Sequence, residues 1–157
     1  MNGVAFRQLT TADAEAISKL LASAPKDYLR YFHPFNFDCE SIRTVLSNAR
    51  KDQFFGLELC NNDSALLAGF YMLRGLDEGY GDPMYGVFIA QQFQGKGLGQ
   101  STLAHAEQFC RHSGIPRLLL KVHPQNIRAK KLYQRAGFQV VRIDPVNDNL
   151  VMEKQLA

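Results

Sequence analysis

The sequence QGKGLG at residues 94–99 places three glycines directly between two apolar patterns of different period. The preceding run, residues 84–90, is apolar enough for a buried central strand. The stretch that follows carries Leu98, Thr102, Ala106, Phe109 and Cys110 on one helical stripe. A strand, a glycine turn and a helix in direct succession predict a mixed α/β architecture in which the backbone of the turn can come very close to a ligand.

Hydrophobic periodicity along the chain predicts the element order β-α-α-β-β-β-α-β-α-β-β, a mixed sheet with helices on its faces. Strands are expected at residues 4–9, 53–60, 65–73, 84–90, 117–122, 138–143 and 150–155. Helices are expected within residues 10–23, after a cap at Asp38, after the glycine loop and over residues 126–136. The aromatic segment 24–37 contains two prolines and is predicted to be irregular.

Composition restricts the classes of function. The 157 residues suit a single domain over residues 1–157, and the net charge of +3 comes with scattered basic residues, which argues against a nucleic-acid partner. No run of 18 apolar residues predicts a membrane span. The unpatterned cysteines Cys39, Cys60 and Cys110 predict neither a disulfide framework nor a metal site. We expect a reduced, soluble, cytoplasmic protein without a membrane partner.

The glycine loop admits several readings. A dinucleotide-binding turn needs G-x-G-x-x-G after the first strand, whereas here the glycines run G-x-G-x-G after the fourth expected strand. A P-loop is excluded because Lys96 is followed by Gly97 rather than Ser or Thr. Two readings stay open: a plain strand-to-helix turn, and a turn whose unpaired helical N–H groups bind a phosphate.

Two motifs around the loop bear on the choice between these readings. The first, [QR]-x-x-G-x-[GA], is met by Gln94, Gly97 and Gly99. The second, N-x-x-A-x-x-L-Y-x-x-x-G-F, is met by Asn126, Ala129, Leu132, Tyr133, Gly137 and Phe138. Together they resemble the GNAT superfamily of acyl-CoA-dependent N-acetyltransferases, whose strand order also fits from residue 4 to the end. The resemblance implies a central mixed sheet of six to seven strands flanked by about four helices.

The resemblance also implies acetyl-CoA as co-substrate and no metal. The pyrophosphate is expected at the loop, on Gln94, Gly95, Lys96, Gly97, Gly99 and Gln100, although Lys96 could equally be a solvated lysine. The pantetheine arm is expected to pair with the backbone of Val87 and Ile89, on a strand that separates from its neighbour. Asn126 is either a cofactor contact or a helix N-cap, or both. Gln91 stands where many members carry proline, which leaves the end of that strand open.

Acetyl transfer to a primary amine by direct attack needs an acid for the leaving thiolate and a base for the amine. Tyr133 matches the general-acid tyrosine of the family; the alternative is a core aromatic. Glu78 and Asp82, with Asp77, precede the central strand and are candidate bases, though such a loop is often only a solvated turn. His33 is a further candidate, with packing as its alternative.

The acceptor is expected to contact Tyr31, Phe32, Phe35 and Tyr85, because aromatic side chains suit an amphipathic ligand. A small amine is favoured, with a weak preference for an amino sugar; a protein N-terminus or lysine stays open. The rivals are a non-catalytic acyl-CoA sensor on the same fold and, less favoured by the glycine spacing, a nucleotide-binding oxidoreductase. Either a monomer or a homodimer is compatible with the sequence.

Overall fold

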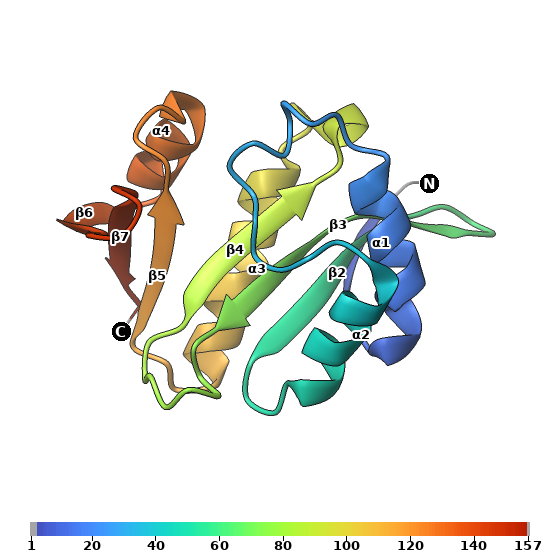
Figure 1. Ribbon diagram of the computed structural model, residues 1–157, viewed down its shortest axis with the longest axis horizontal. Coiled ribbons are helices and arrows are strands. Elements are labelled where there is room, and N and C mark those ends of the chain that lie inside the picture. Colours follow the sequence, from blue (N-terminus) through green and yellow to red (C-terminus); the bar gives the residue numbers. More distant parts are fainter. Residues whose placement is uncertain (1–2, 157) are drawn as a thin grey trace.

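The computed structural model describes residues 3–156 and centres on a seven-stranded mixed sheet in the order β1-β2-β3-β4-β5-β7-β6 (Figure 1). The strands are β1 (Gly3–Gln8), β2 (Gln53–Cys60), β3 (Ala65–Arg74), β4 (Met84–Ile89), β5 (Arg117–Val122), β6 (Gln139–Ile143) and β7 (Leu150–Gln155). The helices are α1 (Ala14–Ala22), α2 (Cys39–Asn48), α3 (Leu98–His112) and α4 (Ile127–Arg135), with short 3-10 turns η1 (Thr11–Asp13) and η2 (Gln91–Phe93). The predicted fold class and element order are confirmed.

The sheet has a separate apolar core on each face. Successive side chains of a strand point to opposite faces, so Phe54 and Phe55 belong to different cores. On one face Phe54 and Phe70 pack with α1 and α2. On the other, Phe55 and Tyr71 pack with α3, which crosses behind the sheet in Figure 1.

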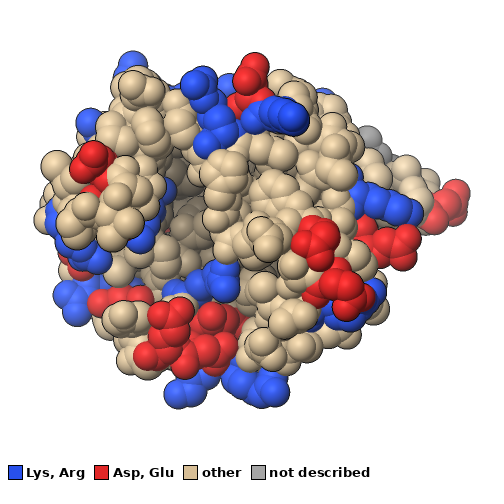
Figure 2. Space-filling model, viewed as in Figure 1, with Lys and Arg blue, Asp and Glu red and all other residues tan. Residues whose placement is uncertain are grey.

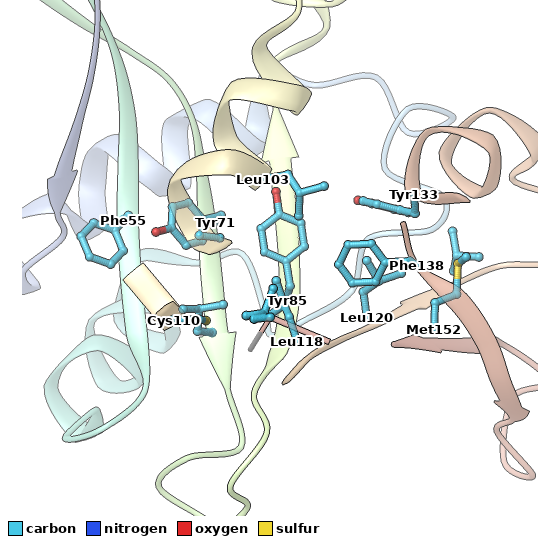
Figure 3. Close-up of a cluster of buried hydrophobic side chains, with 14 residues drawn as sticks. Phe55, Tyr71, Tyr85, Leu103, Cys110, Leu118, Leu120, Tyr133, Phe138 and Met152 are labelled. Carbon is cyan, nitrogen blue, oxygen red and sulfur yellow. The ribbon is translucent and has the colours of Figure 1, made fainter. Parts of the chain in front are cut away.

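The core on the α3 face also joins the two halves of the sheet. Figure 3 shows Tyr85 of β4 and Leu120 of β5 in one cluster with Tyr133 and Phe138. Burial of a large apolar side chain contributes about 1.5–3 kcal/mol, so a cluster of this kind can hold the halves together with little strand pairing between them. A partly buried ion pair between Lys154 Nζ and a carboxylate oxygen of Glu107, 2.7 Å apart, adds a link between β7 and α3.

The segment between α1 and α2 is irregular, as its two prolines predicted. Its aromatic side chains pack on the α1 and α2 face, where Phe32 contacts Phe70 and Phe88 edge-on or tilted. Asp38 then caps α2 by accepting the Ser41 N–H at 2.9 Å, as expected. The segment therefore lies against the sheet beside β4.

Gly69 of β3 lies directly against the backbone of β4. A Cβ at this position would lie 2.3 Å from the Phe88 carbonyl oxygen and 3.0 Å from the Ile89 Cα, and backbone atoms cannot move aside cheaply. We expect Gly69→Ala to lower the free energy of unfolding by about 1–3 kcal/mol, measured by urea denaturation. Gly81→Ala is the control, because nothing lies within 4 Å of its Cβ position. Equal stability of the two variants would contradict the close approach.

Candidate active site

The site is built on the separation of β4 from β5. The two strands run parallel but pair only at Met84 with Leu119 and Tyr85 with Leu120, and Figure 1 shows them diverging beyond that point. The Ala90 N–H donates to a carbonyl of β3. Because backbone groups alternate between the two neighbours of a strand, those of Val87 and Ile89 face the opposite, open side.

A cleft of about 750 Å³ occupies the space between the diverging strands. Figure 2 shows it as a hollow on this face of the molecule. Several residues predicted for the site line this cleft together: Tyr31, Phe32, His33, Tyr85, Val87, Ile89, Gln94, Asn126 and Tyr133. Side chains from four separate parts of the chain thus meet at one place.

Two aromatic contacts fasten the segment 24–37 over the cleft. The Tyr28 hydroxyl donates a hydrogen bond to the Ile89 carbonyl at the open edge of β4. The Tyr31 ring stacks on the His123 ring, with centroids 4.5 Å apart, so the segment reaches the end of β5. These contacts enclose the cleft and leave the backbone groups of Val87 unoccupied by either ring.

The glycine loop lies just beyond the far end of β4, where Gln94 lines the cleft. Gly95 and Gly97 both have φ +76°, a left-handed conformation that glycine adopts without steric cost, and nothing lies within 4 Å of a Cβ at either. Gly97 is the N-cap of α3 and provides no side-chain cap, so the first N–H groups of α3 lack intrahelical partners. This arrangement suits an anion.

Tyr85 and Tyr133 meet at the other end of the cleft from the glycine loop, where β4 and β5 begin to diverge. Tyr133 of α4 is 8% exposed, and burial raises its pKa to about 12, so the phenol stays protonated at neutral pH. Figure 3 shows its hydroxyl directed from α4 toward Tyr85, whose ring it meets edge-on at 6.4 Å. The Tyr85 hydroxyl is buried without a hydrogen-bond partner among residues 3–156, and burial raises its pKa as well.

Asn126 is a helix N-cap, as predicted, and its side of α4 faces the cleft, where a cofactor contact stays a prediction. Its side-chain oxygen accepts the Ala129 N–H at 3.4 Å, which makes it the N-cap of α4, and it also lines the cleft. Its helix ends as predicted, since Gly137 follows with φ +101°.

The predicted acidic residues lie elsewhere. Asp77 accepts the backbone N–H groups of Arg50, Lys51 and Asp52 and thereby stabilises a turn. Asp82 pairs with Arg117 at 3.2 Å, and Glu78 is exposed on the same loop. Neither Glu78 nor Asp82 lines the cleft, and no other Asp or Glu of the described chain does so.

One predicted acceptor residue is also placed differently. Phe35 does not line the cleft; it packs against Phe37 and Phe70 on the α1 and α2 face, with ring centroids 6.3 and 6.4 Å away. Tyr28, an aromatic residue of the segment 24–37 expected to form the acceptor pocket, does line the cleft. The remaining lining residues were not predicted individually; they are Arg30, Pro34, Met72, Arg74, Met84, Gly86, Phe88, Lys121, Val122, His123, Ala129, Asn147 and Asn149. His123 and Ala129 fall in the stretch HPQNIRAKKLY that carries the second motif.

The two imidazoles of the cleft share one tautomer but differ in whether Nδ1 is already engaged in a hydrogen bond. His123 Nδ1 accepts the Gln125 N–H at 3.1 Å, so the neutral ring carries its proton on Nε2. His33 Nε2 lies 3.1 Å from the Arg30 carbonyl oxygen, which can only accept a hydrogen bond. The neutral ring of His33 therefore carries its proton on Nε2 and keeps a lone pair on Nδ1.

The family is established by comparison. The model of the acetyltransferase (GNAT) domain matches residues 4–139, so the chain belongs to the GNAT acetyltransferases, as its two motifs predicted.

No helix of residues 3–156 is long and apolar enough to cross a membrane. Within the same range, no three His, Cys, Asp or Glu side chains lie close enough together to bind a metal ion.

Curated relatives share part of the chain. A mycothiol acetyltransferase of Propionibacterium freudenreichii subsp. shermanii is 33% identical over 92 residues, which are 57% of this chain and 29% of that protein. A spermine/spermidine N(1)-acetyltransferase of Bacillus subtilis is 39% identical over 70 residues, 44% of this chain and 46% of that protein. The matches thus span less than half the length of either relative.

Solved structures share the whole fold. A domain from Methanocaldococcus jannaschii superposes with a TM-score of 0.82 at 18% identity and covers 99% of both chains. The PaiA N-acetyltransferase from Thermoplasma acidophilum, solved in complex with coenzyme A, gives a TM-score of 0.74 at 19% identity, over 98% of this chain and 99% of that chain. At such identities the likeness establishes the fold alone.

Proposed function

We propose that this protein transfers an acetyl group from acetyl-CoA to a primary amine by direct attack in a ternary complex. One observation carries the proposal: the open edge of β4 connects a glycine-built anion site at one end to the phenol of Tyr133 at the other. Membership of the GNAT acetyltransferases supports it, as does the coenzyme A bound by a protein of the same fold.

The cleft suits the shape of the cofactor. The pyrophosphate would bind the N–H groups of the glycine loop, and the pantetheine arm would pair with the backbone of Val87 and Ile89 like an added strand. A strand rises about 3.3 Å per residue, so the path from Ile89 to Tyr85 spans about 13 Å. The thioester would thus lie near Tyr85 and Tyr133. Tyr28 already occupies the Ile89 carbonyl, which leaves the groups of Val87 and the N–H of Ile89 for the arm.

The chemistry requires three groups. The neutral amine attacks the thioester carbon, a C–N bond forms, and backbone N–H groups of β4 stabilise the oxyanion. The C–S bond then breaks, and Tyr133 donates its proton to the departing thiolate. The acylated nitrogen loses its extra proton, which returns to the phenolate through water, so that the amide and free CoA are the products. A raised pKa keeps Tyr133 protonated until that moment, because burial disfavours the phenolate.

The base is assigned to His33. An ammonium must lose a proton before it can attack, and no Asp or Glu of the described chain lines the cleft. His33 is the lining imidazole whose Nδ1 lone pair accepts no hydrogen bond within residues 3–156, whereas that of His123 accepts the Gln125 N–H. It would accept the amine proton directly or through one water.

Acetyl-CoA binding is tested at Gly97. At ~100 times the dissociation constant, acetyl-CoA should stabilise the protein by about 2.7 kcal/mol. Gly97→Val should remove this gain, since a branched side chain blocks the approach of the pyrophosphate. Gly114→Val is the matched control: it has a similar φ of +73° and equally open surroundings but ends α3. Thermal unfolding with and without acetyl-CoA measures this stabilisation in both variants and in the wild type. A shift with ATP or NADH and none with acetyl-CoA would refute the cofactor assignment.

Tyr133→Phe tests the general acid. The change keeps the buried ring and deletes only the donor, so kcat and kcat/KM should fall together by at least ~10², with acetyl-CoA affinity retained. Single-turnover rates are compared, because slow product release could hide the loss. Tyr80→Phe, at an exposed tyrosine outside the cleft, is the control. A wild-type single-turnover rate in Tyr133→Phe would make Tyr133 a core aromatic only.

His33→Gln tests the base. We expect kcat/KM for an aliphatic amine to fall about 10²-fold. An arylamine, already neutral at the assay pH, should lose much less because it needs no prior deprotonation. His123→Gln is the matched control, since His123 lines the same cleft but its Nδ1 already accepts the Gln125 N–H. Equal losses in the two variants, or equal losses for both kinds of amine, would remove His33 from this role.

A further inference from the structure

Arg74 is a half-buried cation without an ionic partner. It ends β3 and lines the cleft, where its Nη1 donates to the Pro34 carbonyl oxygen at 3.2 Å and its guanidinium lies 5.9 Å from the Phe54 ring centroid. None of the ion pairs formed within residues 3–156 includes it. Removing a charge from water is costly unless it is paired, so this position favours a bound anion.

The rest of the cleft carries basic and no acidic side chains. Arg30 and Lys121 also line it, and no carboxylate of the described chain does. Lys121 is already paired with Asp144 at 2.8 Å, whereas Arg30 lies over the Tyr31 ring at 5.2 Å. Figure 2 shows basic side chains at the hollow, while the acidic side chains of this face lie outside it.

The position of Arg74 separates it from the phosphate site. In the β3–β4 register Arg74 pairs with Met84, the first residue of β4, whereas the glycine loop comes after Ile89, the last residue of β4. The six residues of β4 span about 17 Å. An anion on Arg74 would therefore lie at the end of the cleft where β4 begins, and could not be the pyrophosphate on the loop.

We infer that the acceptor is a primary amine that also carries a carboxylate or a phosphate, and that Arg74 binds this anionic group. The inference rests on the proposed function, since it names the acceptor of that same transfer. A planar guanidinium binds either oxyanion through paired N–H donors. A polyamine would instead bring several positive charges into a cleft without carboxylates, which is unfavourable.

Matched acceptors test the inference by the release of free CoA. The pairs are glycine with glycinamide and glucosamine 6-phosphate with glucosamine, and spermidine is the polycation. We expect kcat/KM to be about 10–100-fold higher for the anionic member of at least one pair, the range of a charged hydrogen bond. The pair that responds distinguishes a carboxylate from a phosphate. Higher activity with spermidine or with the neutral members would overturn the inference.

Variants at Arg74 test whether this residue causes the preference for an anionic acceptor. Arg74→Gln should abolish the preference by raising KM for the anionic amine while kcat changes little, and Arg74→Lys should keep part of it, because the charge remains without the planar fork. Arg43→Gln, on α2 outside the cleft, is the control. A preference that survives in Arg74→Gln would also overturn the inference.

Failure of the proposed function is recognised separately. It would appear as no CoA release with any amine and no stabilisation by acetyl-CoA. Binding of an anion at Arg74 is then tested by the shift in thermal unfolding that glucosamine 6-phosphate or glycine produces. Stabilisation of the wild type but not of Arg74→Gln supports the site, and no stabilisation of either protein overturns it.

Discussion

The two-residue pairing between β4 and β5 is the feature on which the rest of this structure depends. A parallel pair that continued to Ile89 would use the backbone groups of Val87 for sheet formation and leave no cleft. The strands can diverge because the halves of the sheet are joined instead by side chains, with Tyr85, Leu120 and Tyr133 in one buried cluster. Packing thus replaces hydrogen bonds at the place where hydrogen-bonding groups are left for a ligand.

In Tyr133, the packing that stabilises the cluster also produces the protonated phenol that the proposed mechanism requires. Its ring packs edge-on against Tyr85 and Phe138, which fixes the direction of the hydroxyl. The burial that stabilises the ring also raises the pKa of the phenol to about 12. Tyr133 can therefore be both a core aromatic and a proton donor. Only a variant that keeps the ring and removes the hydroxyl distinguishes the two roles.

Much of the fold was predictable because its signals are local. Caps at Asp38 and Asn126, the glycine after α4 and the proline-broken segment 24–37 each depend on neighbouring residues alone, and the structure confirms them. The candidate site was less predictable. Phe35 and Phe32 are equally aromatic in sequence, yet only Phe32 lines the cleft, because an irregular segment has no period from which a face can be read. Likewise, the partners that engage Asp77 and Asp82 are distant in the chain.

By itself, the sequence determined the order of the elements, the glycine turn before α3 and the motif that carries Asn126 and Tyr133, since each is a pattern within one stretch of chain. Only the tertiary structure decided the charge and outline of the cleft. Arg74, His33 and His123 belong to three separate segments, and they meet because β4 and β5 diverge while residues 28–34 lie across the gap. A cation without a partner cannot be recognised in a sequence, because its partner, or the lack of one, is set by the folding of the whole sheet.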